Sequence, residues 1–136
     1  MTKLLLVKLH IFITLLFISS AALSHAKSVS SDPAPRSVVN RSPESITILF
    51  NQQLEPAYST IVVTNSSGKL VTEKAAVVDL KNNKRLILVL PNLIPDKYTV
   101  SYKVLSLDGH VVKSTYKFRI KREVPLAERC NTLVLQ

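Results

Sequence analysis

A carboxylate and an imidazole lie two residues apart in the stretch Ser106-Leu107-Asp108-Gly109-His110. In an extended chain, residues i and i+2 project to the same side, so Asp108 and His110 can converge on one ion. Carboxylate oxygens and imidazole nitrogens are both ligands of divalent transition metals. Because two donors do not complete a metal site, further ligands must come from another part of the chain.

The same stretch also has a purely structural interpretation. Asp-Gly between two alternating apolar runs predicts a β-hairpin with a type I′ turn, because Asp tolerates and Gly readily adopts the positive φ that this turn requires. A turn explains Asp108 and Gly109 without any function, and His110 then simply begins the next strand. The spacing of these residues leaves both interpretations open.

The first two dozen of the 136 residues have the pattern of a cleavable secretory signal. Two lysines precede the apolar run of residues 11–18, which is too short to cross a bilayer as a helix. Small residues permit cleavage after Ser24 or after Ala26. Cleavage after Ser24 would make His25 the first residue of an exported chain that is long enough for one domain.

The charge distribution and the small number of sulfur-containing residues limit the functions that the protein can have. The net charge is +9, but lysines and arginines are spread along the chain, which favours solubility and a mild attraction to anionic surfaces over nucleic-acid binding. Cys130 is the only cysteine, so no internal disulfide can form, and we interpret it as an incidental thiol. Met1 is the only methionine and leaves with the signal, which excludes a thioether-rich Cu(I) site.

The pattern of apolar residues predicts about seven short strands with turn signals about every ten residues, and no amphipathic helix. The segment after His25 is expected to form an edge strand that ends before Pro33. The other predicted strands are Ser45–Phe50, Thr60–Thr64, Lys69–Thr72, Ala75–Leu80, Arg85–Leu90, Lys97–Val104 and residues 112–120. This pattern indicates an all-β, small Greek-key β-sandwich of the immunoglobulin-like or cupredoxin-like kind, whose core includes Tyr98, Val100, Phe118 and Ile120.

Two segments of this sequence resemble the CopC family of periplasmic copper-resistance proteins. The run His25-Ala26-Lys27-Ser28-Val29-Ser30-Ser31-Asp32-Pro33 resembles the mature start of that family, His-x-x-Leu-x-Ser-Ser-x-Pro. Residues 95–110, which end in Ser-Leu-Asp-Gly-His, are similar to its Gly-x-Tyr-x-Val-x-Trp-x-Val-x-Ser-x-Asp-Gly-His. The resemblance implies a signal peptide at 1–24, a CopC-like domain at 25–121 and a tail at 122–136.

The resemblance implies a periplasmic protein that binds one Cu(II) ion and sequesters or delivers it. The implied ligands are the α-amino group and ring of His25, together with Asp108 and His110, which favours cleavage after Ser24. This set of nitrogen and oxygen donors suits tetragonal Cu(II), whereas zinc prefers a tetrahedron. Because the methionine-rich segment of some members is absent, the chain resembles the branch with a Cu(II) site only. The implied partner is an inner-membrane copper importer of the CopD type, and we expect a monomer.

Three positions depart from the family pattern. Tyr102 stands at the tryptophan position, Asp96 replaces a turn glycine, and Gln52 stands where some members have a carboxylate near the metal.

Two other functions compete with copper carriage. An N-terminal histidine that chelates copper also occurs in polysaccharide mono-oxygenases, but Asp108 would occupy a position that oxygen needs, and the chain has no tryptophan. An immunoglobulin-like interaction module with Asp108-Gly109 as a plain turn is the other alternative. A copper titration of the processed protein separates this module from a copper carrier.

Overall fold

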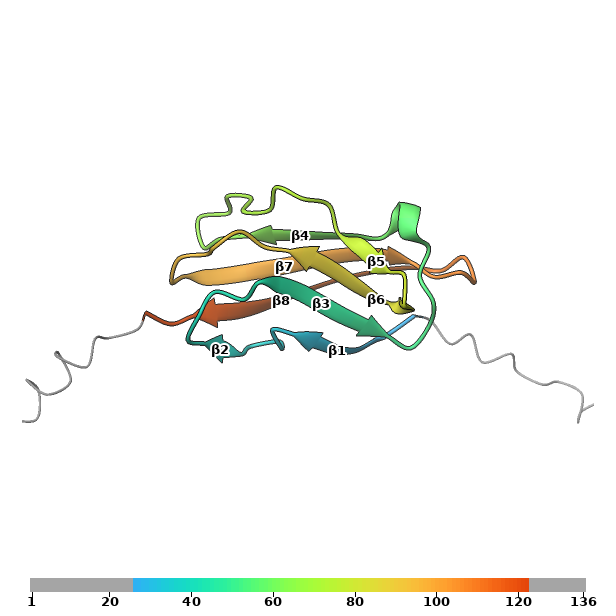
Figure 1. Ribbon diagram of the computed structural model, residues 1–136, viewed down its shortest axis with the longest axis horizontal. Helices are drawn as coiled ribbons and strands as arrows, with labels where there is room; N and C mark the ends of the chain where they lie inside the picture. The colour runs from blue at the N-terminus through green and yellow to red at the C-terminus, as the bar shows by residue number, and fades with distance from the viewer. Residues whose placement is uncertain (1–25, 123–136) are drawn as a thin grey trace, which may run out of the picture.

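The computed structural model describes residues 26–122, which form two four-stranded β-sheets packed face to face (Figure 1). One sheet has the strand order β1-β3-β6-β5 and the other β2-β8-β7-β4. The elements are β1 (Ser28–Asp32), β2 (Val38–Val39), β3 (Ser45–Phe50), the 3-10 turn η1 (Pro56–Tyr58), β4 (Thr60–Thr64), β5 (Val77–Asp79), β6 (Asn82–Val89), β7 (Lys97–Leu105) and β8 (Val111–Ile120). The predicted all-β sandwich is therefore confirmed. Within the described residues, no helix has the length and apolar character needed to cross a bilayer.

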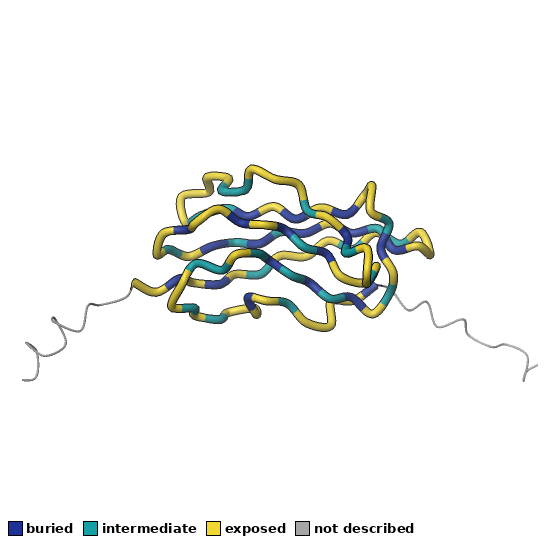
Figure 2. Tube along the Cα trace, viewed as in Figure 1, coloured by how far each residue is buried: buried dark blue, intermediate teal, exposed yellow. Residues whose placement is uncertain are grey.

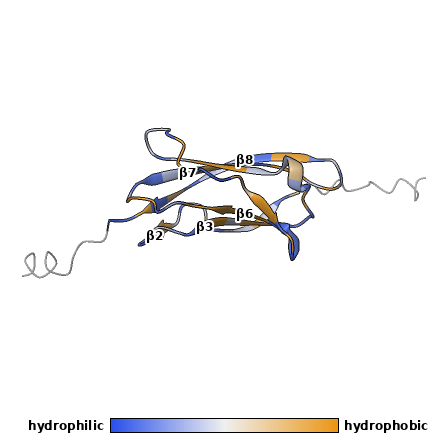
Figure 3. Ribbon diagram, turned by 45° about the horizontal axis from the view of Figure 1, so that its top comes forward, coloured by the Kyte–Doolittle hydropathy of each residue, from blue (hydrophilic) through white to orange (hydrophobic). Residues whose placement is uncertain are grey.

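The core lies between the two sheets, because every second residue of the central strands points inward. Buried and exposed positions alternate along these strands in Figure 2, and Figure 3 shows β3 and β6 in one layer and β7 and β8 in the other. The ring of Tyr98 stacks on Phe118 with 5.4 Å between the centroids. The predicted burial of Tyr98, Val100, Phe118 and Ile120 is confirmed.

Three details of the strand prediction are wrong. The predicted strand Lys69–Thr72 is reduced to a single bridge between Thr64 and Leu70, because the side chain of Asn65 accepts the backbone N–H groups of Ser67 and Lys69 (3.1 and 2.8 Å) and holds the chain in a turn. The predicted turn at residues 81–84 is shorter, since β6 already begins at Asn82. The two-residue strand β2, which pairs in parallel with β8, is too short to leave a pattern in the sequence.

The hairpin between β7 and β8 is confirmed, but its predicted type I′ turn is wrong. Gly109 has a φ of +87°, whereas Asp108 is not among the described residues with positive φ. The N–H of Gly109 donates to the carbonyl of Ser106 (2.9 Å), and the N–H of Ser106 donates to the carbonyl of His110 (3.0 Å). The loop therefore has three residues, a turn followed by a left-handed glycine, which is the next most common hairpin connection.

Loops from both sheets meet at the end of the sandwich where this hairpin lies. Figure 1 shows the start of β1, the segment after β3, the β5–β6 turn and the β7–β8 hairpin at the same end. The segment after β3 contacts its neighbours through backbone bonds, from Leu54 to Asn83 (2.9 Å) and from Glu55 to Leu105 (2.8 Å). The fold thus brings the first described residues and the hairpin to one end.

Candidate metal centre

The β7–β8 hairpin brings Asp108 and His110 into direct contact. Oδ2 of Asp108 lies 3.2 Å from Nδ1 of His110, and both side chains are a little over one third exposed. The contact comes from the three-residue loop, because the left-handed Gly109 returns the chain so that the residues on either side of it face each other. The predicted convergence of these two side chains is therefore present, although a turn and not an extended strand produces it.

A buried hydroxyl fixes the carboxylate of Asp108. The Oγ of Ser106, a residue that is 1% exposed, donates a hydrogen bond to Oδ1 of Asp108. The backbone N–H of His110 donates to the same oxygen at 3.3 Å. The Ser106 bond, supported by that N–H, lowers the pKa of Asp108 to about 2, because both donors favour the charged carboxylate. Oδ1 is therefore engaged within the loop, while Oδ2 faces the imidazole.

The first described residues are anchored at this same end. Asn51, just after β3, accepts the N–H of Lys27 through its side-chain oxygen (2.6 Å) and donates its own N–H to the carbonyl of Lys27 (3.0 Å). The hydroxyl of Tyr102 donates to the Oγ of Ser28 (3.1 Å), so the tyrosine at the family's tryptophan position ties β1 to β7. Ala26 is 3% exposed. The chain is thus held against the sandwich up to its first described residue.

The segment 51–53 connects this anchor to the hairpin. Gln53 accepts the backbone N–H of Leu107 through its carbonyl at 3.1 Å, two residues from the Asn51 anchor. A surface hollow of about 340 Å³ lies between the segment and the hairpin, and its lining includes Gln52 and Asp108. Gln52, which stands where some family members have a carboxylate near the metal, therefore lines the same hollow as Asp108.

The described donors fit a metal but do not complete its coordination. Two ligand atoms that each lie about 2.0–2.1 Å from one metal at a right angle are about 2.9 Å apart. The 3.2 Å between Oδ2 of Asp108 and Nδ1 of His110 is close to that separation. In the segment 26–122, no group of three or more His, Cys, Asp or Glu side chains gathers around one point. His25, the third predicted ligand, and Cys130 lie outside the described residues.

The fold is a small β-sandwich of the kind found in copper-resistance proteins, and the chain belongs to the CopC family, since the CopC domain matches residues 28–121. Proteins of this family bind copper and take part in copper resistance and transport. The structure of CopC from Methylosinus trichosporium OB3b is 34% identical, with a TM-score of 0.70, and the match covers 75% of this chain and 99% of that one. PcoC, a methionine-rich copper resistance protein from Escherichia coli, is 25% identical with a TM-score of 0.64, covering 72% of this chain and 100% of that one.

Sequence comparison also finds relatives among the YobA proteins and a copper transport protein. Protein YobA of Escherichia coli K12 is 29% identical over 110 residues, which cover 80% of this chain and 89% of the relative. The copper transport protein CutJ of Bacillus subtilis is 30% identical over 107 residues, which are 78% of this chain but only 20% of CutJ. The matched region is thus nearly all of YobA and a fifth of CutJ.

Sequence reasoning missed Ser106 and Asn51 as parts of the site. Ser106 lies two residues before Asp108, and a serine between apolar strand residues that is followed by Asp-Gly indicates a hydroxyl able to bond the turn carboxylate. Asn51 has no comparable signal, because its partner Lys27 is distant in the sequence and the contact depends on the β1–β3 pairing.

Proposed function

We propose that this chain is a periplasmic Cu(II)-binding protein that sequesters or delivers copper without catalytic turnover. Proteins of the CopC family are periplasmic, which agrees with a cleavable signal at residues 1–24. The observation that carries the proposal is the contact between Asp108 and His110, held at the end of the sandwich to which the first described residues are anchored.

The proposed ligands are the α-amino group and ring of His25, Oδ2 of Asp108 and the imidazole of His110. Lys27 is held by two hydrogen bonds to Asn51. His25 comes two residues before this anchor, so it can reach the hairpin at the same end of the sandwich. An amine and a ring on one residue chelate together, so part of the entropy cost of gathering ligands is met within His25. The set supplies nitrogen and oxygen donors, which Cu(II) favours in tetragonal geometry.

The absence of methionine after residue 1 supports a protein with a Cu(II) site only. The match to one fifth of CutJ supports a partner in copper transport, because in that copper transport protein the CopC-like part is joined to a much longer chain. We expect the protein to act as a monomer and to pass copper to, or receive it from, an inner-membrane importer of the CopD type.

A copper titration of the chain that begins at His25 tests the proposal. We expect one Cu(II) per chain and an electron paramagnetic resonance spectrum with nitrogen couplings, both lost in Asp108→Ala and His110→Ala. Lys84→Ala, which changes another residue that lines the hollow, is the matched control and should retain the site. If the chain that begins at His25 binds no Cu(II), a copper-free interaction module is favoured. An unchanged spectrum in both ligand variants would show that copper is held by other residues and would contradict the proposed site.

A further inference from the structure

The outer face of the β4–β7–β8 layer is strongly basic. In the β7–β8 pairing, every second pair points outward, and these outward pairs are Lys97 with Arg119, Thr99 with Lys117, Ser101 with Thr115, Lys103 with Lys113, and Leu105 with Val111. The outward residues of β4 are Thr60, Val62 and Thr64. The five cations of this basic face are exposed, and none of these outward positions carries an acidic residue.

The arrangement of these cations opposes folding. Lys97 lies directly across from Arg119, and Lys103 lies directly across from Lys113. Like charges at directly opposed positions on antiparallel strands are destabilising. The salt bridges found within residues 26–122, Asp79 with Arg85 and Asp108 with His110, lie outside the basic face. Because no salt bridge within residues 26–122 offsets this local cost, the charges are suited to an external anion.

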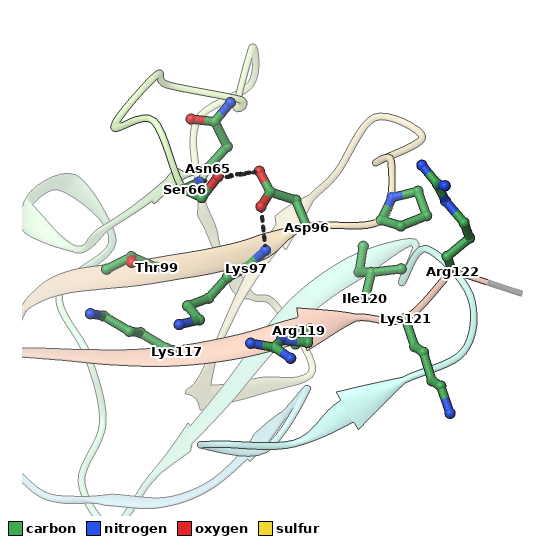
Figure 4. A pocket seen from close by; sticks show the side chains of 11 residues that line it. Asn65, Ser66, Asp96, Lys97, Thr99, Lys117, Arg119, Ile120, Lys121 and Arg122 are labelled. Carbon is green, nitrogen blue, oxygen red and sulfur yellow. Dashed lines mark hydrogen bonds between the residues drawn. The ribbon is translucent and has the colours of Figure 1, made fainter.

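The end of the basic face away from the hairpin opens into a pocket of about 690 Å³. Figure 4 shows Lys97, Lys117 and Arg119 on neighbouring strands along this pocket. The carboxylate of Asp96, which also lines it, accepts hydrogen bonds from the N–H and hydroxyl of Ser66 (3.2 and 2.8 Å) and from the N–H of Lys97 (2.7 Å). Asp96 is therefore turned toward these donors and forms no salt bridge with Lys117 or Arg119.

The other end of the basic face is apolar. Leu105 and Val111 form its last outward pair, and Leu107 follows at the hairpin tip. Val111 is 53% exposed and Leu107 is 58% exposed. The outer face of the other sheet differs, since its outward cation Arg85 is paired with Asp79 at 3.2 Å. A row of cations that ends in exposed apolar side chains is therefore a property of one face of the sandwich.

We propose that the basic face docks on a bilayer that contains anionic phospholipids. Four of its five cations are lysines, which are strongly hydrated point charges suited to a diffuse array of headgroups, whereas protein interfaces are depleted in lysine and enriched in arginine. Attraction to anionic headgroups and burial of apolar side chains both contribute to such binding. In the docked orientation the β7–β8 hairpin lies at the membrane surface. This orientation places the proposed copper site beside an importer, a consequence that rests on the proposed function.

Vesicle sedimentation of the copper-free chain that begins at His25 tests this proposal independently of copper. The probes are vesicles of phosphatidylglycerol with phosphatidylethanolamine, compared with vesicles of phosphatidylcholine alone. We expect binding to the anionic vesicles only, and loss of this binding at about 1 M salt, where charge interactions are screened within about 3 Å.

Two variants of equal net charge locate the binding surface. The first removes three charges from the basic face, with Lys103→Gln, Lys113→Gln and Lys117→Gln. The control removes three exposed charges elsewhere, with Lys69→Gln, Lys74→Gln and Lys81→Gln. We expect affinity for anionic vesicles to fall about tenfold or more in the first variant and to stay near that of the unmodified chain in the control.

An equal loss in both variants would show a response to net charge alone and would overturn the proposal. Unchanged vesicle binding in the first variant, with loss of its binding to polyglutamate, would assign the face to an acidic protein segment and would overturn it as well. Circular dichroism of both variants checks the fold. We expect it to remain intact, because the first variant removes the repulsion between Lys103 and Lys113.

Discussion

The hydroxyl of Ser106, buried beneath the β7–β8 hairpin, donates a hydrogen bond to Oδ1 of Asp108 and also lies 3.1 Å from the carbonyl oxygen of His110. The serine thus contacts both residues of the candidate ligand pair without belonging to it. Its bond to Asp108 leaves the second carboxylate oxygen toward His110. The geometry of the pair therefore depends on a side chain that has no direct role in metal binding.

Replacing this serine should change the acid titration of Asp108. In the copper-free protein the pKa of Asp108 is lowered from 3.8 to about 2, first by the Ser106 hydrogen bond and then by the N–H of His110. A lowered pKa means that the stability contributed by Asp108 is present above pH 3.8 and is lost as the pH falls toward 2. In Ser106→Ala, nuclear magnetic resonance titration of the carboxyl carbon should show a pKa closer to 3.8. An unchanged titration would mean that the serine bond does not stabilise the charged form.

The two hairpin residues should be needed for copper and dispensable for folding. Because both side chains are more than one third exposed, Asp108→Ala and His110→Ala should change the free energy of unfolding by less than about 1 kcal/mol. Both variants should lose Cu(II) in a competition titration against a chromophoric chelator. If His110→Ala unfolds the protein, the histidine is a structural residue of the hairpin.

A core substitution should show the opposite behaviour. Phe118 is buried and its ring stacks on Tyr98, so Phe118→Ala should lower the free energy of unfolding by about 3–5 kcal/mol. Denaturant unfolding measures this change. Where the variant is still folded, it should bind Cu(II) with the affinity of the unmodified chain, because Phe118 lies on β8 away from the hairpin.

The hydrogen bonds between Asn51 and Lys27 should affect the affinity for Cu(II) only by positioning the proposed ligand His25. Asn51→Ala removes the side-chain acceptor for the N–H of Lys27, which lies two residues after His25. We expect weaker Cu(II) binding with little change in the thermal unfolding temperature, since Asn51 is exposed. Asn92→Ala, an exposed asparagine after the end of β6, is the matched control. Equal affinities in the two variants would show that this anchor does not position a ligand.

The sequence was sufficient to predict the parts of the fold that depend on regular alternation. The strands Ser45–Phe50 and Thr60–Thr64, and the long β7–β8 pair, follow their apolar pattern, because one face of each is buried and the other is not. The strand at Lys69–Thr72 was predicted in error because the hydrogen bonds of the Asn65 side chain outweigh a short apolar pattern. Local side-chain bonds of this kind compete with strand pairing.

Only part of the candidate site could be predicted in the same way. Asp108 and His110 are neighbours in the sequence, so their contact follows from the turn whichever turn type forms. Anchors such as Asn51 with Lys27 and Tyr102 with Ser28 join distant segments, and only the pairing of β1 with β3 and the packing of the two sheets bring them together. The outward row of lysines was visible as alternation, but its like-charge pairs depend on the register between β7 and β8.

The proposed N-terminal ligand gives the last prediction, because it distinguishes this site from other pockets that contain histidine. A free α-amino group has a pKa of about 7.7–8.0, so it must release a proton to bind copper near neutral pH. Copper binding to the chain that begins at His25 should therefore release protons and weaken as the pH falls below that range. One residue added before His25 converts the amine into an amide, while the side chains of His25, Asp108 and His110 are all retained. We expect the extended chain to fold normally and to bind Cu(II) far more weakly in a competition titration, and equal affinity would show that the amine is not a ligand.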